Sequence, residues 1–273
     1  MESGFVQVEG GRLYYEVNGS GRPLVLIHAG FLDSRMWDEQ FQLFAQHYKV
    51  IRYDVRGYGK SDRPLSSFSD YKDLHSLLTH LKVKNADVVG VSNGGRIALD
   101  FAVQYPDMVN SLVLVGTGVK GREVSSPEEE KAWDDFDAQM KPQEEAIKEN
   151  RLAEAAERDV DAWASAQTPI SRKHILKIAL DNSHIQKDNP GKLQVSPQLP
   201  AFKRLSEIRA STLVIVGDRD VRGMQYIADD VHSKIPGSKK MVIHGADHIV
   251  NMSKPKEFNK EVLDFLGKTR EPS

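Results

Sequence analysis

One serine of this chain stands among three glycines, an arrangement that suits a nucleophile. Residues 87–95 read D-V-V-G-V-S-N-G-G, so Ser92 lies between Gly90 and Gly94 in the pattern G-x-S-x-G. In such a turn the serine backbone is strained and Oγ projects clear of the sheet, while the glycines let a strand and a helix approach closely. The apolar run before the turn and the helical pattern after it favour this interpretation over a glycine-rich turn in which serine is only a helix N-cap.

A serine nucleophile needs a base, and the base needs a carboxylate that orients it. Among the nine histidines we select His248, which follows a predicted strand and its turn in the stretch I-H-G-A-D-H. Asp220, in the loop after the run V-I-V-G, is the predicted acid, and Asp218 is the reserve candidate. His244 lies nearer the strand end, and we expect it to be structural or exposed.

The negative oxygen that forms when a serine attacks a carbonyl group needs N–H donors. The backbone N–H of Asn93, the residue after the nucleophile, is one expected donor. The second is expected from the loop H-A-G-F after the strand at residues 24–28, where Gly30 is the first candidate.

These residues can meet only if a parallel sheet brings the ends of several strands together. Short apolar runs alternate with helical patterns, which predicts an α/β fold with a mostly parallel central sheet flanked by helices. The expected strands are residues 5–8, 13–17, 23–28, 49–55, 87–91, 111–115, 212–216 and 240–243. The expected helices are residues 36–47, 71–81, 94–104, 221–235 and 255–266.

Residues 118–205 break this alternation. They are rich in Glu, Lys, Ala and Asp and contain no strand-like run, so we interpret them as a helical cap inserted in a core formed by 1–117 and 206–273. We expect the cap and the loops beside the triad to set the substrate. The candidate substrate-binding residues are Phe31, Met224, Val250, Trp133 and Met140.

Composition narrows the class of protein. The chain has 273 residues, 40% hydrophobic and 28% charged, with a formal net charge of −2, which gives no argument for a nucleic acid or an anionic membrane as partner. It contains no cysteine, which excludes disulfides, thiolate metal ligands and a cysteine nucleophile. No apolar run approaches the ~18 residues of a membrane span, and no signal peptide is recognisable. We therefore expect a cytoplasmic protein, whose oligomeric state the sequence does not indicate.

Taken together, these motifs resemble the α/β-hydrolase superfamily, in its branch with a small helical cap. The stretches L-I-H-A-G-F, Y-D-V-R-G-Y-G-K-S-D, V-V-G-V-S-N-G-G, L-V-I-V-G-D-R-D and G-A-D-H-I-V-N-M-S-K-P-K-E-F occur in the family's order. The resemblance implies Ser92 as nucleophile, Asp220 as acid, His248 as base, and the backbone of Gly30 and Asn93 as oxyanion donors.

Two positions depart from the family's pattern. Ala29 stands where the family often has glycine, which leaves open whether Gly30 or Phe31 gives the second oxyanion donor. Val91 stands where the family often has histidine, and this changes little because that side chain is not the nucleophile. Serine at the turn also argues against the relatives that open epoxides or remove halide, since those use aspartate there.

The expected activity is hydrolysis of carboxylic esters or lactones through an acyl-enzyme, without a cofactor. Because only Arg219 and Arg222 add positive charge beside the motifs, we expect a small neutral acyl ester or lactone, with N-acyl homoserine lactones among the candidates. Two alternatives stay open: a carbon–carbon bond hydrolase of the same fold, and a non-catalytic small-molecule receptor or signalling partner. A metal hydrolase is discounted because the patterns H-x-H-x-D-H and H-E-x-x-H are absent.

Overall fold

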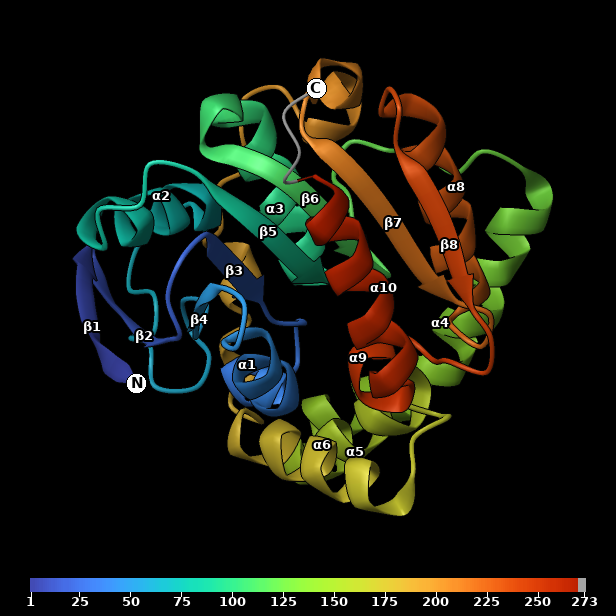
Figure 1. Ribbon diagram of the computed structural model, residues 1–273. Helices are drawn as coiled ribbons and strands as arrows, with labels where there is room; N and C mark the ends of the chain where they lie inside the picture. The colour runs from blue at the N-terminus through green and yellow to red at the C-terminus, as the bar shows by residue number, and fades with distance from the viewer. Residues whose placement is uncertain (270–273) are drawn as a thin grey trace.

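Eight strands form one sheet at the centre of the computed structural model, which describes residues 1–269. The strands are β1 (Glu2–Val8), β2 (Gly11–Asn18), β3 (Pro23–Ile27), β4 (Lys49–Tyr53), β5 (Ala86–Val91), β6 (Val109–Val115), β7 (Ser211–Gly217) and β8 (Lys239–Ile243). Their order in the sheet is β1-β2-β4-β3-β5-β6-β7-β8 (Figure 1). The pairs β1–β2 and β2–β4 are antiparallel and all others are parallel, so the predicted fold class is confirmed.

Helices cover both faces of the sheet. They are α1 (Asp38–Phe44), α2 (Asp70–His80), α3 (Asn93–Gln104), α4 (Pro127–Lys148), α5 (Leu152–Trp163), α6 (Pro169–Asp181), α7 (Ile185–Asp188), α8 (Arg222–Lys234), α9 (Val250–Ser253) and α10 (Pro255–Lys268). Short 3₁₀ turns are η1 (Ser34–Trp37), η2 (Pro106–Met108), η3 (Pro190–Lys192) and η4 (Ala201–Glu207). No helix within residues 1–269 is both long and apolar enough to cross a membrane.

Strand β3 shows why its sequence is a continuous apolar run. Val25 and Ile27 belong to the hydrophobic cluster under α2, α3 and α8, whereas Leu24 and Leu26 belong to the cluster under α1 and α10. Successive side chains of a strand point to opposite faces, so a strand covered on both faces must be apolar at every position. This burial fixes the register of the central strands and therefore the place where each of them ends.

One expected helix is divided in the structure. Residues 36–47 were predicted to be a single helix, but a 3₁₀ turn, η1, precedes α1, which ends at Phe44. Asp33 caps η1 by accepting a hydrogen bond from the N–H of Arg35, and the N–H of Tyr48 closes a turn on the Phe44 carbonyl. The chain has to turn there because β4 begins at Lys49, a constraint that the helical period does not reveal.

Helices α4 to α7 lie between β6 and β7 along the chain. In Figure 1, α5 and α6 lie below the sheet, at the end where the arrowheads of the parallel strands point, and α4 lies beside α8. The division into a core of 1–117 and 206–273 and a cap of 118–205 stays a prediction, and residues 270–273 of the predicted core lie outside the described residues.

Candidate active site

Ser92 occupies a strained turn between β5 and α3. Its φ and ψ are 55° and −113°, and its side chain makes no capping hydrogen bond to α3, so it is not an ordinary helix N-cap. A Cβ on Gly90 would lie 2.3 Å from the carbonyl oxygen of Gly94, and one on Gly94 would lie 2.3 Å from the carbonyl oxygen of Ile27. Both glycines are therefore required by close backbone contacts at this turn.

Asp220 and His248 form a buried pair. Nδ1 of His248 lies 2.9 Å from Oδ1 and 3.0 Å from Oδ2 of Asp220. His248 is 2% exposed and Asp220 is 6% exposed. The carboxylate also accepts a 2.7 Å hydrogen bond from the N–H of Val221, which fixes its orientation. With Nδ1 directed at the carboxylate, Nε2 is the ring nitrogen left for a substrate or nucleophile.

Gly116 links this pair to Ser92. A Cβ on Gly116 would lie 3.0 Å from both Asp220 Oδ2 and His248 Nδ1, and its φ of 47° also favours glycine. The preceding residue, Val115, accepts a 2.8 Å hydrogen bond from the N–H of Ser92. The pair therefore packs on the strand end that is bonded to Ser92, and the residues predicted as a triad gather where β5, β7 and β8 end.

A buried histidine holds the loop that was expected to supply an oxyanion donor. The N–H of Val55 donates to Nε2 of His28 at 2.9 Å, so Nδ1 carries the proton and donates to the Ala29 carbonyl at 2.8 Å. A Cβ on Gly30 would lie 3.6 Å from Cβ of Asn93, which places this loop beside the turn after Ser92.

Three backbone donors in this corner are unused. Within the described residues, the N–H groups of Gly30, Phe31 and Asn93 make no hydrogen bond. The Phe31 side chain is half-buried and packs against the apolar cluster under α1 and α10. The corner thus offers free donors on both sides of Ser92, as an oxyanion site requires.

An aromatic row leads from α4 to the imidazole of His248. The ring of Trp163 lies 4.5 Å from that of His248, Phe136 lies 4.7 Å from Trp163, and Trp133 lies 6.2 Å from Phe136, all between ring centroids. Trp133, a predicted substrate-binding residue, packs on Gly223 and is two rings away from His248. Trp163, at the end of α5, is the ring in contact with His248, and nothing in the sequence ranks it above Trp133.

The other predicted substrate-binding residues lie at different depths. Val250 is fully buried in the cluster under α1 and α10, so it is a core residue rather than an exposed lining residue. Met224, near the start of α8, is 5% exposed. Met140 lies half-buried on α4, and no described contact joins it to the triad residues.

Asp247 also belongs to the region around His248, although its place in the sequence does not indicate this. Its buried carboxylate accepts hydrogen bonds from the N–H of Ala166 at 2.8 Å, from Nε2 of Gln167 at 2.8 Å and from the N–H of Ile249 at 3.0 Å. Burial raises the pKa of Asp247. The residue before His248 thereby joins the connection between α5 and α6 to the histidine loop.

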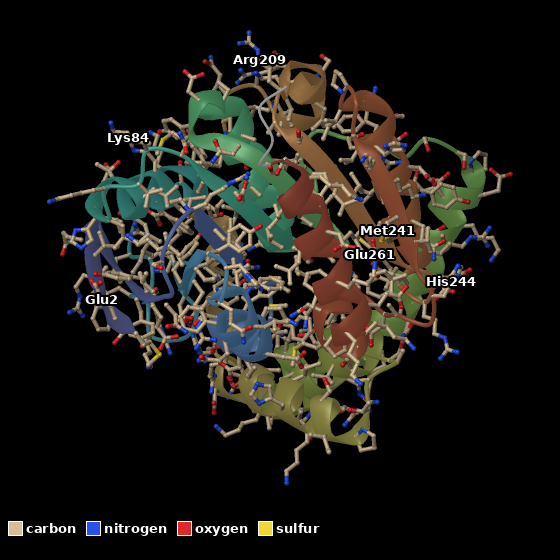
Figure 2. The ribbon with its side chains drawn as sticks, in the orientation of Figure 1. Glu2, Lys84, Arg209, Met241, His244 and Glu261 are labelled. Carbon is tan, nitrogen blue, oxygen red and sulfur yellow. The ribbon has the colours of Figure 1, made fainter. Side chains whose placement is uncertain are left out.

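Asp218 and His244 form a separate pair at the surface. Nδ1 of His244 lies 2.9 Å from Oδ2 of Asp218, whose other oxygen accepts from the N–H of Gly245 at 2.6 Å. The bond with His244 lowers the pKa of Asp218. Figure 2 shows His244 at the outer edge of the molecule, so Asp218 closes an exposed turn. Within residues 1–269, no group of three or more His, Asp and Glu side chains is arranged to hold a metal ion.

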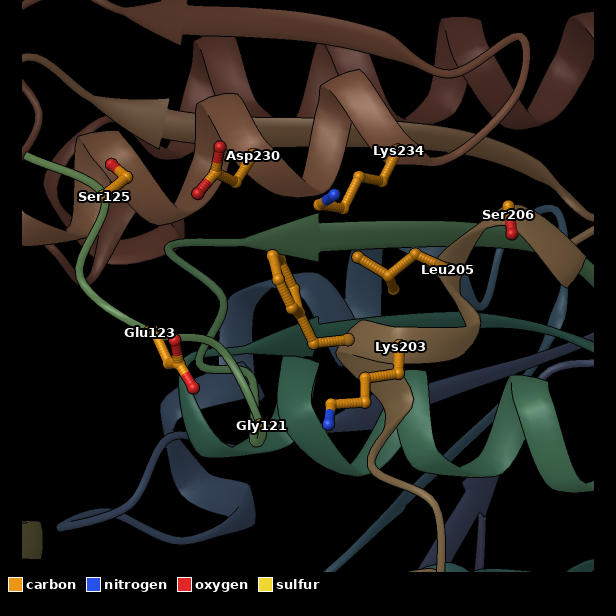
Figure 3. Close-up of a pocket in the computed structure, with 9 residues that line it drawn as sticks. Gly121, Glu123, Ser125, Lys203, Leu205, Ser206, Asp230 and Lys234 are labelled. Carbon is orange, nitrogen blue, oxygen red and sulfur yellow. The ribbon is translucent and has the colours of Figure 1, made fainter.

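Figure 3 shows a cavity that none of the predicted triad residues lines. It has a volume of about 620 Å³ and is formed by the loop after β6, by η4 and by α8. Its lining residues are Gly121, Glu123, Ser125, Phe202, Lys203, Leu205, Ser206, Asp230 and Lys234, and none of them belongs to the predicted triad.

The sequence as a whole decides which family this architecture represents. Residues 22–255 match the family model described as the alpha/beta hydrolase fold. The chain belongs to the alpha/beta hydrolase family. The matched region runs from just before β3 to the start of α10 and so includes Ser92, Asp220 and His248.

Relatives of this alpha/beta hydrolase carry several names. Over 124 residues it is 35% identical to the uncharacterized protein Rv2715 of Mycobacterium tuberculosis, a match that covers 44% of this chain and only 36% of the relative. The solved structure of a bromoperoxidase from Bacillus anthracis is 26% identical, with a TM-score of 0.79, over 97% of this chain and 100% of the other. Est816, described as an N-acyl homoserine lactone degrading enzyme, is 25% identical, with a TM-score of 0.73, over 96% and 100%.

Proposed function

We propose that this alpha/beta hydrolase cleaves carboxylic esters or lactones through an acyl-enzyme, with Ser92 as nucleophile, His248 as base and Asp220 as acid. The observation that carries the proposal is the strained Ser92 turn beside the buried Asp220–His248 pair, both packed on the end of β6. A serine held in an unfavourable backbone conformation next to an oriented imidazole is the arrangement that acyl transfer requires.

The first half of the reaction forms the acyl-enzyme. Nε2 of His248 takes the proton of Ser92 as Oγ bonds to the substrate carbonyl carbon. The carbonyl oxygen becomes negative and is stabilised by the N–H of Asn93 and by the N–H of Gly30 or Phe31. The carbon–oxygen bond to the leaving group then breaks, and His248 protonates the departing alkoxide.

The second half releases the acid. His248 takes a proton from water, the hydroxide attacks the acyl carbonyl, and the bond to Oγ breaks as Ser92 regains its proton. Asp220 keeps the proton of the imidazole on Nδ1 and stabilises the imidazolium in both halves. In a lactone the leaving alkoxide stays attached to the acyl group, so one product is released instead of two.

The segment 118–205 is proposed as the cap over this site, and Trp163 supports that role because its ring lies 4.5 Å from the His248 ring. The likeness to Est816 supports lactones, including N-acyl homoserine lactones, as test substrates beside simple esters.

The test compares wild type with Ser92→Ala on p-nitrophenyl acetate, butyrate and octanoate and on a panel of lactones that includes N-acyl homoserine lactones. We expect steady turnover by wild type and a loss of at least about 10³-fold in kcat/KM for Ser92→Ala, because the nucleophile is removed. Ser233→Ala is the matched control, since Ser233 is exposed on α8 and donates only to the Asp230 carbonyl.

Equal, slow rates for wild type and Ser92→Ala would contradict the proposal. Vinylogous diketone acids then test the carbon–carbon alternative, and ligand binding without turnover tests the receptor alternative.

A further inference from the structure

A small cavity begins at the residue that follows the nucleophile. It has a volume of about 250 Å³, and Asn93 forms part of its wall. The other walls come from the loop after β4, the start of α2 and the first turn of α3. Lys120, which follows β6, and the segment 190–194 complete the lining. Tyr58 and Phe68 add two aromatic rings. Because Asn93 directly follows Ser92, the cavity begins one residue from the proposed nucleophile.

Two of the three cations that line this cavity already have carboxylate partners. Arg56 donates two hydrogen bonds, of 2.8 and 2.7 Å, to Asp73. Arg96 pairs with Asp70 and, at 3.1 Å, with Asp100. Their positive charges are therefore balanced within the protein, and neither guanidinium needs a ligand.

Lys120 is different. Its ammonium donates a hydrogen bond to Oε1 of Gln194, an uncharged group, and in residues 1–269 it has no carboxylate within ion-pair distance. Burial, and then the charge of Arg96, lower the pKa of Lys120, whereas Asp100 and Asp70 raise it from beyond ion-pair distance. The ammonium therefore lacks a direct carboxylate partner, and an anion in the cavity would supply one.

Gln194 supplies a second unused donor. Its oxygen accepts from Lys120, whereas its Nε2 is buried and has no hydrogen-bond partner. A buried donor without a partner costs about 1–3 kcal/mol, so this amide calls for a partner that the surrounding side chains do not supply. Lys120 and Gln194 thus present two adjacent donors, and the one carboxylate among the lining residues, Asp70, is paired with Arg96.

Resting on the function proposed above, we propose that this cavity is a subsite for a carboxylate carried by the acyl part of the substrate. One carboxylate oxygen accepts from Nζ of Lys120 and the other from Nε2 of Gln194, while the ester or lactone carbonyl lies at Ser92. The side chain of Asp70 in the same wall disfavours a dianion, so a singly charged carboxylate fits better than a phosphate. This replaces the wholly neutral substrate that the sequence indicated.

The first experiment compares two esters that differ only in charge: mono-p-nitrophenyl glutarate and its methyl-capped form, p-nitrophenyl methyl glutarate. The readout is the ratio of their kcat/KM values, with succinate and adipate analogues to find the best length. We expect wild type to favour the acid, and Lys120→Met to lower the ratio by about 10- to 100-fold, the size of a lost charged hydrogen bond. Lys84→Met, which changes an exposed lysine far from the site (Figure 2), keeps the wild-type ratio.

A second measurement does not depend on catalysis. Glutarate binding is measured by calorimetry on Ser92→Ala, on Ser92→Ala with Lys120→Met, and on Ser92→Ala with Gln194→Leu. We expect each added change to weaken binding about tenfold or more, with melting temperatures confirming that all three proteins are folded. Binding lost in this way supports the subsite even if no ester is hydrolysed, in which case only the proposed function fails. Equal glutarate affinity in the three proteins, or an unchanged ratio in Lys120→Met, overturns the subsite.

Discussion

Two single residues of this hydrolase adopt states that cost free energy of folding. The φ of 55° at Ser92 is one such state, of a kind that costs about 1–3 kcal/mol and persists only when the surroundings enforce it. Asp159 on α5 is another, because its carboxylate is buried and accepts hydrogen bonds only from the amides of Gln143 and Gln186. Burial raises the pKa of Asp159 to about 7, and in the described chain no cation forms an ion pair with it.

This pKa predicts a pH dependence of stability. Between the ordinary pKa of 3.8 and about 7 the folded protein binds a proton at Asp159 that the unfolded chain does not, so the contribution is full below pH ~4 and is lost as the pH rises through 7. Asp159→Asn should reduce the fall in unfolding free energy between pH 5 and 8 by on the order of 2 kcal/mol. Urea unfolding at both pH values measures this. Asp161→Asn, exposed on the same helix, is the control, and equal slopes for wild type and Asp159→Asn would count against the prediction.

At the scale of elements, the region where α5 gives way to α6 is attached to the loop that carries His248. Trp163 ends α5 with its ring against His248, and the connection that follows it is bound to Asp247 through Ala166 and Gln167. The same carboxylate accepts from the N–H of Ile249, so one side chain positions both the cap connection and the histidine loop.

Asp247→Ala should therefore destabilise the protein and disturb His248, the proposed base, at the same time. The N–H groups of Ala166 and Ile249 lose their acceptor, whereas Nε2 of Gln167 keeps its 3.3 Å bond to the Ile249 carbonyl. At about 1–3 kcal/mol for each unpaired group and about 2–4 °C per kcal/mol, the melting temperature should fall by at least about 4 °C. The kcat for a neutral ester should also fall, because the loop that carries His248 is less well held. Asp247→Asn keeps one carbonyl oxygen and should lie between the two in both measurements. A fully active, equally stable Asp247→Ala protein is the outcome that would refute this role.

At the scale of the whole molecule, two helices of the proposed cap share a hydrophobic cluster with the central sheet. The cluster that contains Leu26 of β3 and Phe258 of α10 also contains Val160 of α5 and Ile178 of α6. Such continuity makes separate unfolding of the cap unfavourable, because it would expose the apolar face of the core.

We expect a single unfolding transition. The chain has three tryptophans, of which Trp37 lies in the core and Trp133 and Trp163 lie on α4 and α5. In a Trp133→Phe, Trp163→Phe protein the fluorescence of Trp37 should change at the same urea concentration as the far-UV circular dichroism. In the Trp37→Phe protein, the fluorescence of the two remaining tryptophans, both in the proposed cap, should change at the same urea concentration as the far-UV circular dichroism of that protein. Two separated midpoints in either protein would show that the cap unfolds independently.

Much of the fold and of the predicted triad was accessible from the sequence, because the relevant signals are local. A glycine on each side of Ser92, a strand before it and a helix after it are read within a dozen residues, and the apolar period of two or 3.6 residues marks most elements. The order of acid and histidine along the chain followed from the ends of the predicted strands.

Only the tertiary structure decided which distant side chains meet. It paired Asp220 with His248 and Asp218 with His244. The two aspartates are only two positions apart in one loop, so sequence position alone does not decide which of them meets which histidine. The tertiary structure also selected Trp163 over Trp133 as the ring beside His248. Whether a side chain on a long helix points at the site depends on how that helix packs, and whether a cation is balanced depends on partners far away in sequence. The spacing of residues along the sequence reveals neither how a helix packs nor which distant side chains pair. The strand, turn and helix around Ser92, in contrast, are encoded by neighbouring residues.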